Sequence, residues 1–224
     1  MVIGMKSLNN ERGFTIVELM IASLVFSLIL VMLTFGVISF SNRYYKGVNA
    51  SLTQGTARAA IDAVAQAVQF GTSDVTPTDP AKNYFCAGGN FFIYEQGVMY
   101  TGDTATTTGL YMVPMTSAIC APPLPVVSAT NGRQLLADRT RLTDISVVST
   151  SPNTYTIDMT IAYGDNDLLC APVSSAGSCG AGASTLSDTD LAGASDVQCK
   201  TISGSQFCAV SQISTAVHKR VVKT

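Results

Sequence analysis

Charged side chains are scarce in this chain of 224 residues. Asp, Glu, Lys and Arg make up 12% of it and apolar residues 47%, whereas globular proteins carry about 25% charged residues. This composition excludes an intrinsically disordered chain, which needs high charge and low hydrophobicity. The net charge of −2 provides no basic field for the phosphates of nucleic acid, so we expect no direct nucleic-acid binding.

Histidine and the common catalytic motifs are also nearly absent. The single histidine, His218, stands beside Lys219 and Arg220, a pattern typical of a solvated basic patch. No nucleophile elbow, P-loop or dinucleotide fingerprint occurs. A Ser-His-Asp arrangement stays open, because the members of a triad need not be close in sequence. The sequence therefore offers no recognisable active site, and we expect a protein that is not an enzyme.

Metal-binding patterns are incomplete. None of the six cysteines forms the C-x-x-C pair that is typical of zinc sites. Residues 165–167, Asp-Asn-Asp, resemble a fragment of a calcium loop but lack the glycine and the terminal glutamate of an EF-hand. We interpret them as a turn, and expect neither a metal nor another cofactor.

The apolar residues are concentrated near the N-terminus. Residues 19–40 contain no charged side chain, and about 20 such residues suffice for a helix to cross a bilayer core. A buried core helix would show a polar stripe, and a signal peptide has an apolar core of about 7–15 residues before a small-residue cleavage site. Neither pattern is present, so this segment predicts a retained membrane span. Lys6 and Arg12 before it predict a cytoplasmic N-terminus.

Glu18 places one carboxylate at the mouth of this apolar segment. An ionisable group at membrane depth is costly and often marks a functional site. Alternatively, the carboxylate reaches the lipid headgroups and is stabilised there by the positive end of the helix dipole. Both interpretations stay open, because Glu18 lies only one helical turn beyond Phe14.

Residues 12–20, RGFTIVELM, resemble the prepilin processing motif of type IV pilins and type II secretion pseudopilins. The resemblance rests on a short basic leader, glycine, phenylalanine, three further residues, glutamate and an apolar helix. It implies that a prepilin peptidase cleaves after Gly13 and N-methylates the new N-terminus, Phe14. It also implies that Thr15 and Glu18 act in assembly. The resemblance pairs Glu18 with the N-terminal ammonium of a neighbouring subunit, which would compensate a buried carboxylate.

Three parts are expected along the chain. Residues 1–13 are a cleaved cytoplasmic leader, residues 14–70 a long helix, and residues 71–224 an exported, β-rich head with disulfides. The membrane span covers about residues 14–40 of the helix, and residues 41–70 are its amphipathic half.

The helix prediction rests on the absence of proline before Pro77 and on apolar residues at helical spacing. These are Ile61, Val64, Ala65 and Val68. Gly71 and the two residues after it predict the helix end. The resulting fold class is α+β, a pilin-like lollipop whose helix packs by its second half on an antiparallel β-sheet.

Several strands are predicted in the head. Residues 90–100 predict a hairpin that turns at 95–97, and residues 110–114 predict a short strand. Residues 143–149 and 155–163 predict a second hairpin with one solvated face. A final strand is expected within residues 210–222.

All six cysteines lie in the part expected to be exported, where an even number indicates up to three disulfides. They are Cys86, Cys120, Cys170, Cys179, Cys199 and Cys208. Six cysteines allow 15 pairings. Short loops close most readily, which favours Cys86 with Cys120, Cys170 with Cys179 and Cys199 with Cys208. Residues 171–198 are rich in Ser, Gly and Ala and predict a surface loop, either for a partner or as a tolerated insertion.

The resemblance implies a structural subunit, a minor pilin of a type IV pilus or of a type II secretion-like pseudopilus. Its partners would be other pilin subunits, the prepilin peptidase, the inner-membrane assembly platform and the membrane itself. It would reside in the cytoplasmic membrane with its N-terminus inside, and then in an extracellular pilus or periplasmic pseudopilus. Adhesion, motility, DNA uptake and secretion all stay open. The alternative is an exported enzyme or receptor that uses a pilin-like anchor.

Overall fold

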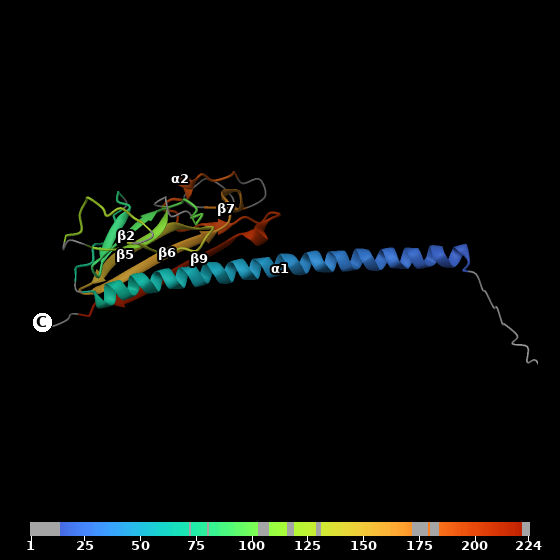
Figure 1. Ribbon diagram of the computed structural model, residues 1–224, viewed down its shortest axis with the longest axis horizontal. Coiled ribbons are helices and arrows are strands. Elements are labelled where there is room, and N and C mark those ends of the chain that lie inside the picture. The colour runs from blue at the N-terminus through green and yellow to red at the C-terminus, as the bar shows by residue number, and fades with distance from the viewer. Residues whose placement is uncertain are drawn as a thin grey trace, which may run out of the picture. The chain divides into compact units, whose positions relative to one another are not determined.

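The computed structural model describes residues 14–71, 73–79, 81–102, 108–115, 119–128, 131–171, 179 and 184–220 (Figure 1). The chain divides into two compact units, Met1–Arg43 and Tyr44–Thr224. Helix α1 (Ile16–Phe70) contributes its first part to one unit and its second part to the other.

The strands belong to three antiparallel sheets in the second unit. Sheet A contains β1 (Tyr84–Ala87), β2 (Asn90–Glu95), β3 (Gly109–Pro114) and β4 (Arg133–Gln134), in that order. Sheet B contains β5 (Thr140–Ser151), β6 (Thr154–Tyr163) and β9 (Ala209–His218). Sheet C pairs β7 (Leu169–Cys170) with β8 (Gln198–Cys199). Among the described residues the unit also contains three short helices, η1 (Asn166–Leu168), α2 (Asp188–Leu191) and η2 (Ser205–Phe207).

The second half of α1 packs on these sheets through one face. Its buried side chains include Ala57, Ala60, Ile61, Val64 and Val68. The predicted apolar face is present at Ile61, Val64 and Val68, whereas Ala65 is half-buried. They share a core with apolar residues of sheets A and B, among them Phe85, Phe92, Leu142 and Ile157. The predicted α+β class, with a long helix packed on antiparallel sheets, is confirmed.

α1 ends at Phe70, and the packing requires glycine at the next position. A Cβ on Gly71 would lie 1.9 Å from the Cα of Gly88, and one on Gly88 would lie 2.3 Å from the carbonyl oxygen of Ala67. Only two facing glycines permit this approach. Gly88 is also in the left-handed region, with φ of 62°, so it serves both the helix contact and the turn between β1 and β2.

Strand β9 lies beside α1 and runs in the same direction (Figure 1). At its beginning, the side-chain amide of Asn49 donates to the carbonyl oxygen of Gln206 at 3.0 Å. At its end, the backbone N–H of Arg220 donates to the carbonyl oxygen of Gln69 at 3.0 Å. We name the end of the head at Asn49, which comes earlier along α1, the near end, and the end at Gln69 the far end.

The hairpin predicted within residues 90–100 is wrong. β2 instead pairs with β1 across Gly88 and Gly89, both with positive φ, and with β3 on its other side. Residues 97–100 pair with β5, where the N–H of Gly97 donates to the carbonyl oxygen of Leu142 at 2.8 Å. The two adjacent glycines make the tighter turn, which decides the pairing of β2.

The other predicted strands are present. Residues 110–114 fall in β3, the hairpin of β5 and β6 turns at Pro152 and Asn153, and β9 supplies the final strand. The expectation of a solvated outer face on β6 holds only in part. Thr160 and Ala162 are buried there, and Ala162 belongs to a second apolar core that covers this end of the strand.

The prediction of a surface loop for residues 171–198 holds only in part, because most described residues are exposed but the second core buries several others. Leu186, Leu191, Ala194 and Val197 are buried in it, and Ser187 closes the start of α2 with a capping box. Few apolar residues occur in this segment, but most of those that the structure describes point inward. Residues 172–178 and 180–183 lie outside the described part.

Three disulfides hold the head together. They join Cys86 with Cys120, Cys170 with Cys179 and Cys199 with Cys208. This is the pairing favoured by short loops. Cys86 and Cys120 pack in a third apolar cluster on sheet A, and the other two bonds close loops beside the second core.

Candidate functional site

The N-terminus of α1 is closed by a reciprocal capping box between Thr15 and Glu18. The Glu18 carboxylate accepts from the backbone N–H and from the hydroxyl of Thr15, each at 3.0 Å. In return, the Thr15 Oγ1 accepts from the backbone N–H of Glu18 at 3.2 Å. The spacing T-x-x-E produces this arrangement directly. Both donors meet the same oxygen, Oε2, and a carboxylate offers about four acceptor positions, so the group retains capacity for another donor.

Of the two positions before Thr15, the structure describes Phe14 but not Gly13. Phe14 is 80% exposed, and Gly13, the predicted cleavage position, lies outside the described residues. The structure therefore brings Thr15 and Glu18 together and presents the aromatic ring of Phe14 to its surroundings.

The first part of α1 exposes an almost continuous apolar surface. Every residue from 16 to 40 is exposed, including Leu19, Phe26, Leu33 and Phe40. Within the described residues, α1 is the one helix long and apolar enough to cross a membrane. Soluble proteins rarely expose apolar surface on this scale, so this surface requires lipid or other protein chains around it.

Three hydroxyl groups of this segment are satisfied within the helix. The hydroxyls of Ser23, Ser27 and Thr34 donate to the carbonyl oxygens of Met20, Ser23 and Leu30 at 2.8–2.9 Å. A hydroxyl that donates to a carbonyl oxygen of its own helix needs no water molecule as a hydrogen-bond partner. These three side chains therefore meet the requirement that polar groups be satisfied internally within lipid.

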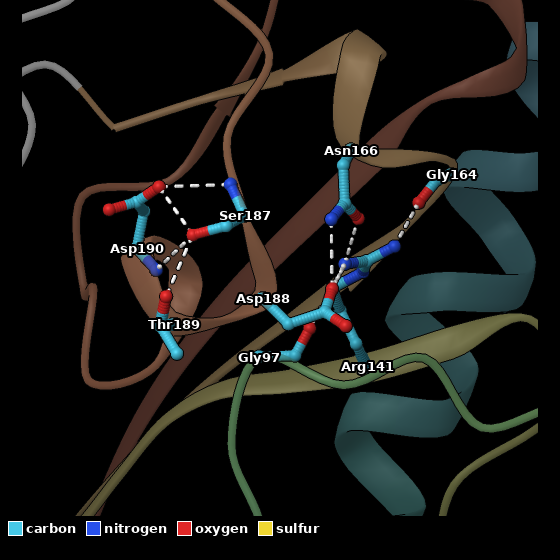
Figure 2. A network of polar contacts seen from close by, with 8 residues as sticks. All are labelled: Gly97, Arg141, Gly164, Asn166, Ser187, Asp188, Thr189 and Asp190. Carbon is cyan, nitrogen blue, oxygen red and sulfur yellow. Dashed lines mark hydrogen bonds and ion pairs between the residues drawn. The ribbon is translucent and has the colours of Figure 1, made fainter.

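In the head, a buried arginine organises the loops beside the second core (Figure 2). The Arg141 side chain is 1% exposed and donates to the carbonyl oxygens of Gly97 at 3.0 Å and Gly164 at 2.9 Å. It also donates to the side chains of Asn166 and Asp188, the latter at 3.3 Å. Burial lowers the pKa of Arg141, and the charge of Asp188 opposes this effect. The arrangement fixes three chain segments around β5, a structural task.

Sequence reasoning missed this network. It treated residues 165–167 as an isolated turn, whereas Asn166 begins helix η1 and bonds to both Arg141 and Asp188. An arginine beside Leu142 at the start of a predicted strand region was the available signal, because long charged side chains are almost never buried without partners.

A polar groove opens between the two larger sheets. It is lined by Asp79, Lys82, Tyr94 and Glu95 from one side and by Asp144 from β5. Burial raises the pKa of Tyr94 to about 12 and, with the charge of Asp158, raises the pKa of the Asp144 carboxyl. Asp79 and Lys82 pair with each other at 3.1 Å. Thr78 and Ser146 also line the groove, and the Thr78 hydroxyl accepts from the backbone N–H of Val147 at 3.0 Å.

The lone histidine sits at the far end of the head. The His218 Nδ1 lies 3.2 Å from the Thr154 hydroxyl on an exposed strand end. Within the ranges that the structure describes, no three His, Cys, Asp or Glu side chains group together as metal ligands would. The features that bear on function are therefore the capped, apolar N-terminal helix and the surfaces that surround it.

One family matches the chain, over residues 8–34, and its description is the prokaryotic N-terminal methylation motif. No curated protein and no solved structure matches the chain. The matched residues include Gly13, Phe14 and Glu18 and the first part of α1, so the predicted resemblance is confirmed. The chain carries the type IV prepilin-type signature, which, with its long apolar helix, supports a type IV pilin-like or pseudopilin-like precursor.

Proposed function

We propose that this chain is a structural subunit, a minor pilin, of a type IV pilus or a type II secretion-like pseudopilus. A prepilin peptidase removes residues 1–13 and N-methylates Phe14. The mature helix, from residue 14 to about 70, waits in the cytoplasmic membrane with its N-terminus inside and its head, residues 71–224, outside. The assembly platform then transfers it into a filament with other pilin subunits.

The observation that carries this proposal is the combination of the methylation motif with a long helix whose first part is apolar and exposed. Lipid can cover such a helix before assembly, and the equivalent helices of other subunits can cover it afterwards. The disulfide-bonded head suits the oxidising side of the membrane. A structural role requires no active site, and the buried Arg141 is explained by the loops that it holds.

Glu18 has two tasks in this proposal. In the single chain it caps its own helix through Thr15. In the filament its carboxylate also forms an ion pair with the N-terminal ammonium of Phe14 of a neighbouring subunit. The remaining acceptor capacity of the carboxylate makes both contacts possible at once, and low dielectric between packed helices strengthens the ion pair.

A pair of substitutions at Glu18 separates these tasks. Glutamine can replace glutamate in a capping box, so Glu18→Gln retains the cap and removes the charge, whereas Glu18→Ala removes both. We expect both variants to reach the membrane but to enter filaments poorly, as measured by immunoblotting of sheared filaments against the membrane fraction. Thr15→Ser is the matched control, because it retains the cap. Normal incorporation of Glu18→Gln would overturn the proposed ion pair.

A further inference from the structure

Two exposed aromatic rings meet at the near end of the head. Phe207 of η2 contacts Tyr45 of α1, with ring centroids 5.5 Å apart. Phe207 is 45% exposed and Tyr45 48% exposed. Tyr44 lies beside Tyr45, with its ring centroid 6.0 Å away. We name Tyr44, Tyr45 and Phe207 the basal aromatic patch.

Phe207 is held in this position by its loop. Helix η2 starts after Gly204, whose φ is 95°, and the disulfide of Cys208 with Cys199 closes the loop. The carbonyl oxygen of Gln206 accepts from the buried side chain of Asn49 at 3.0 Å. These constraints tie the loop to α1, so the exposure of the Phe207 ring is a fixed property of the fold.

The covalent chain sets the distance from this patch to the apolar segment. Tyr45 follows Phe40, the last residue of the uncharged run, by five positions. α1 is helical here, so the separation along its axis is about 7.5 Å. Each headgroup layer of a bilayer is about 5–8 Å thick. If residues 19–40 span the hydrocarbon core, Tyr45 lies at the level of the outer headgroups.

We propose that the basal aromatic patch rests in the outer phospholipid headgroup layer, so that the head contacts lipid through Phe207 before assembly. Aromatic rings favour this layer, and the neighbouring cations Arg43 and Lys46 suit lipid phosphates. The inference rests on the membrane span in the proposed function and adds a contact made by the head itself. Its partner is a phospholipid surface.

The absence of tryptophan from the chain permits a direct test with single reporters. The full-length variant Phe207→Trp is placed in nanodiscs of phosphatidylcholine and phosphatidylglycerol, with or without bromine on the acyl chains. We expect its emission to fall with bromine near the headgroup end of the chain, and to fall less with bromine near the methyl end. Unaltered emission in both brominated lipids would overturn the proposal.

Val148→Trp is the matched control. Val148 is 50% exposed and pairs with Thr156, which in turn pairs with Ala216 near the end of β9. The far end of the head is about 30 Å from Asn49, given 20 helical residues between Asn49 and Gln69. We expect no quenching at this position, and quenching equal to that of Phe207→Trp would also overturn the proposal.

Leu28→Trp, within the apolar segment, separates this inference from the proposed function. Quenching at position 28 without quenching at position 207 would retain the span and reject the lipid contact, whereas no quenching at either would reject the span. Formation of three disulfides, measured by mass, reports folding of each variant.

A second test needs no substitution: a headgroup spin label should broaden the NMR amide signals of Gln206 and Phe207 in the wild-type protein, and not that of Val148. Equal signal intensity with and without the label at both amides would contradict the proposal.

Discussion

Replacing Arg141 with alanine removes the side chain that ties three loop segments to β5. The carbonyl oxygens of Gly97 and Gly164, both in buried residues, lose a charged donor, and each bond to a charged group contributes roughly 1.5–3 kcal/mol. The ion pair with Asp188 adds little, because that side chain is 49% exposed.

One opposing effect reduces the expected loss. The Arg141 Nε is buried and has no hydrogen-bond partner among the described residues, which costs about 1–3 kcal/mol in the folded state and disappears with the side chain. We therefore expect a net destabilisation of about 3 kcal/mol. For a domain of this size, that corresponds to a decrease in Tm of roughly 6–12 °C.

The assay is thermal unfolding of the full-length protein in detergent, followed by near-ultraviolet circular dichroism of the tyrosines. The matched control is Arg139→Ala, two residues away, where the guanidinium is 56% exposed and lies 3.7 Å from Asp165. We expect this control to lose at most about 1 kcal/mol. A Tm of Arg141→Ala equal to that of Arg139→Ala would refute the argument that the buried network stabilises the head.

Two further predictions concern the head. Chain entropy predicts that replacing Cys86 and Cys120 by alanine costs about 3.8 kcal/mol, against about 2.6 kcal/mol for either of the other pairs, because the sequence separations are 34 and 9. Calorimetry of the three double variants checks this order, and a reversed order would contradict it. The Asp144 carboxyl has a raised pKa in the folded state, so its ionised form opposes folding at neutral pH. This penalty decreases as the pH falls through the folded pKa and is gone below the lower, unfolded pKa. Asp144→Asn should therefore raise the Tm at pH 7 and have a smaller effect in acid, whereas an equal shift at both pH values would exclude titration as the cause.

The long helix and its apolar face were predictable from the sequence because both depend on local signals. Absence of proline up to Pro77 and the spacing of Ile61, Val64 and Val68 report helix length and packing face directly. The hairpin of β5 and β6 was equally predictable, since asparagine is common in turns and Asn153 adopts the positive φ that this turn requires.

The strand pairing of sheet A and the second core depend on contacts between distant residues. Nothing local to residues 97–100 indicates that they pair with β5, which lies about 40 residues later in the chain. Likewise, apolar residues are widely spaced in the segment that contains Leu186, Leu191 and Val197. These residues meet in the second core, beside the pairing of β7 with β8 and the disulfides. The partners of Arg141 are separated along the chain in the same way.

At the candidate site, the sequence predicted which residues matter more readily than how they are arranged. The T-x-x-E spacing contains the capping box of Thr15 and Glu18, yet the resemblance to prepilins directs attention only to the intermolecular role of Glu18. The basal aromatic patch could not be predicted from the sequence as a unit. Tyr45 and Phe207 are 162 positions apart, and their contact follows only from the folded loop of η2.

The mass of the N-terminal peptide tests the central claim most directly. The chain, produced in cells that contain a prepilin peptidase, should begin at Phe14 and carry one added methyl group on its α-amine. Gly13→Leu should abolish this cleavage, whereas Gly4→Leu, a substitution of another leader glycine, should leave it intact. An unprocessed wild-type chain, or cleavage at the same position in Gly13→Leu, would contradict the account of this protein as a prepilin.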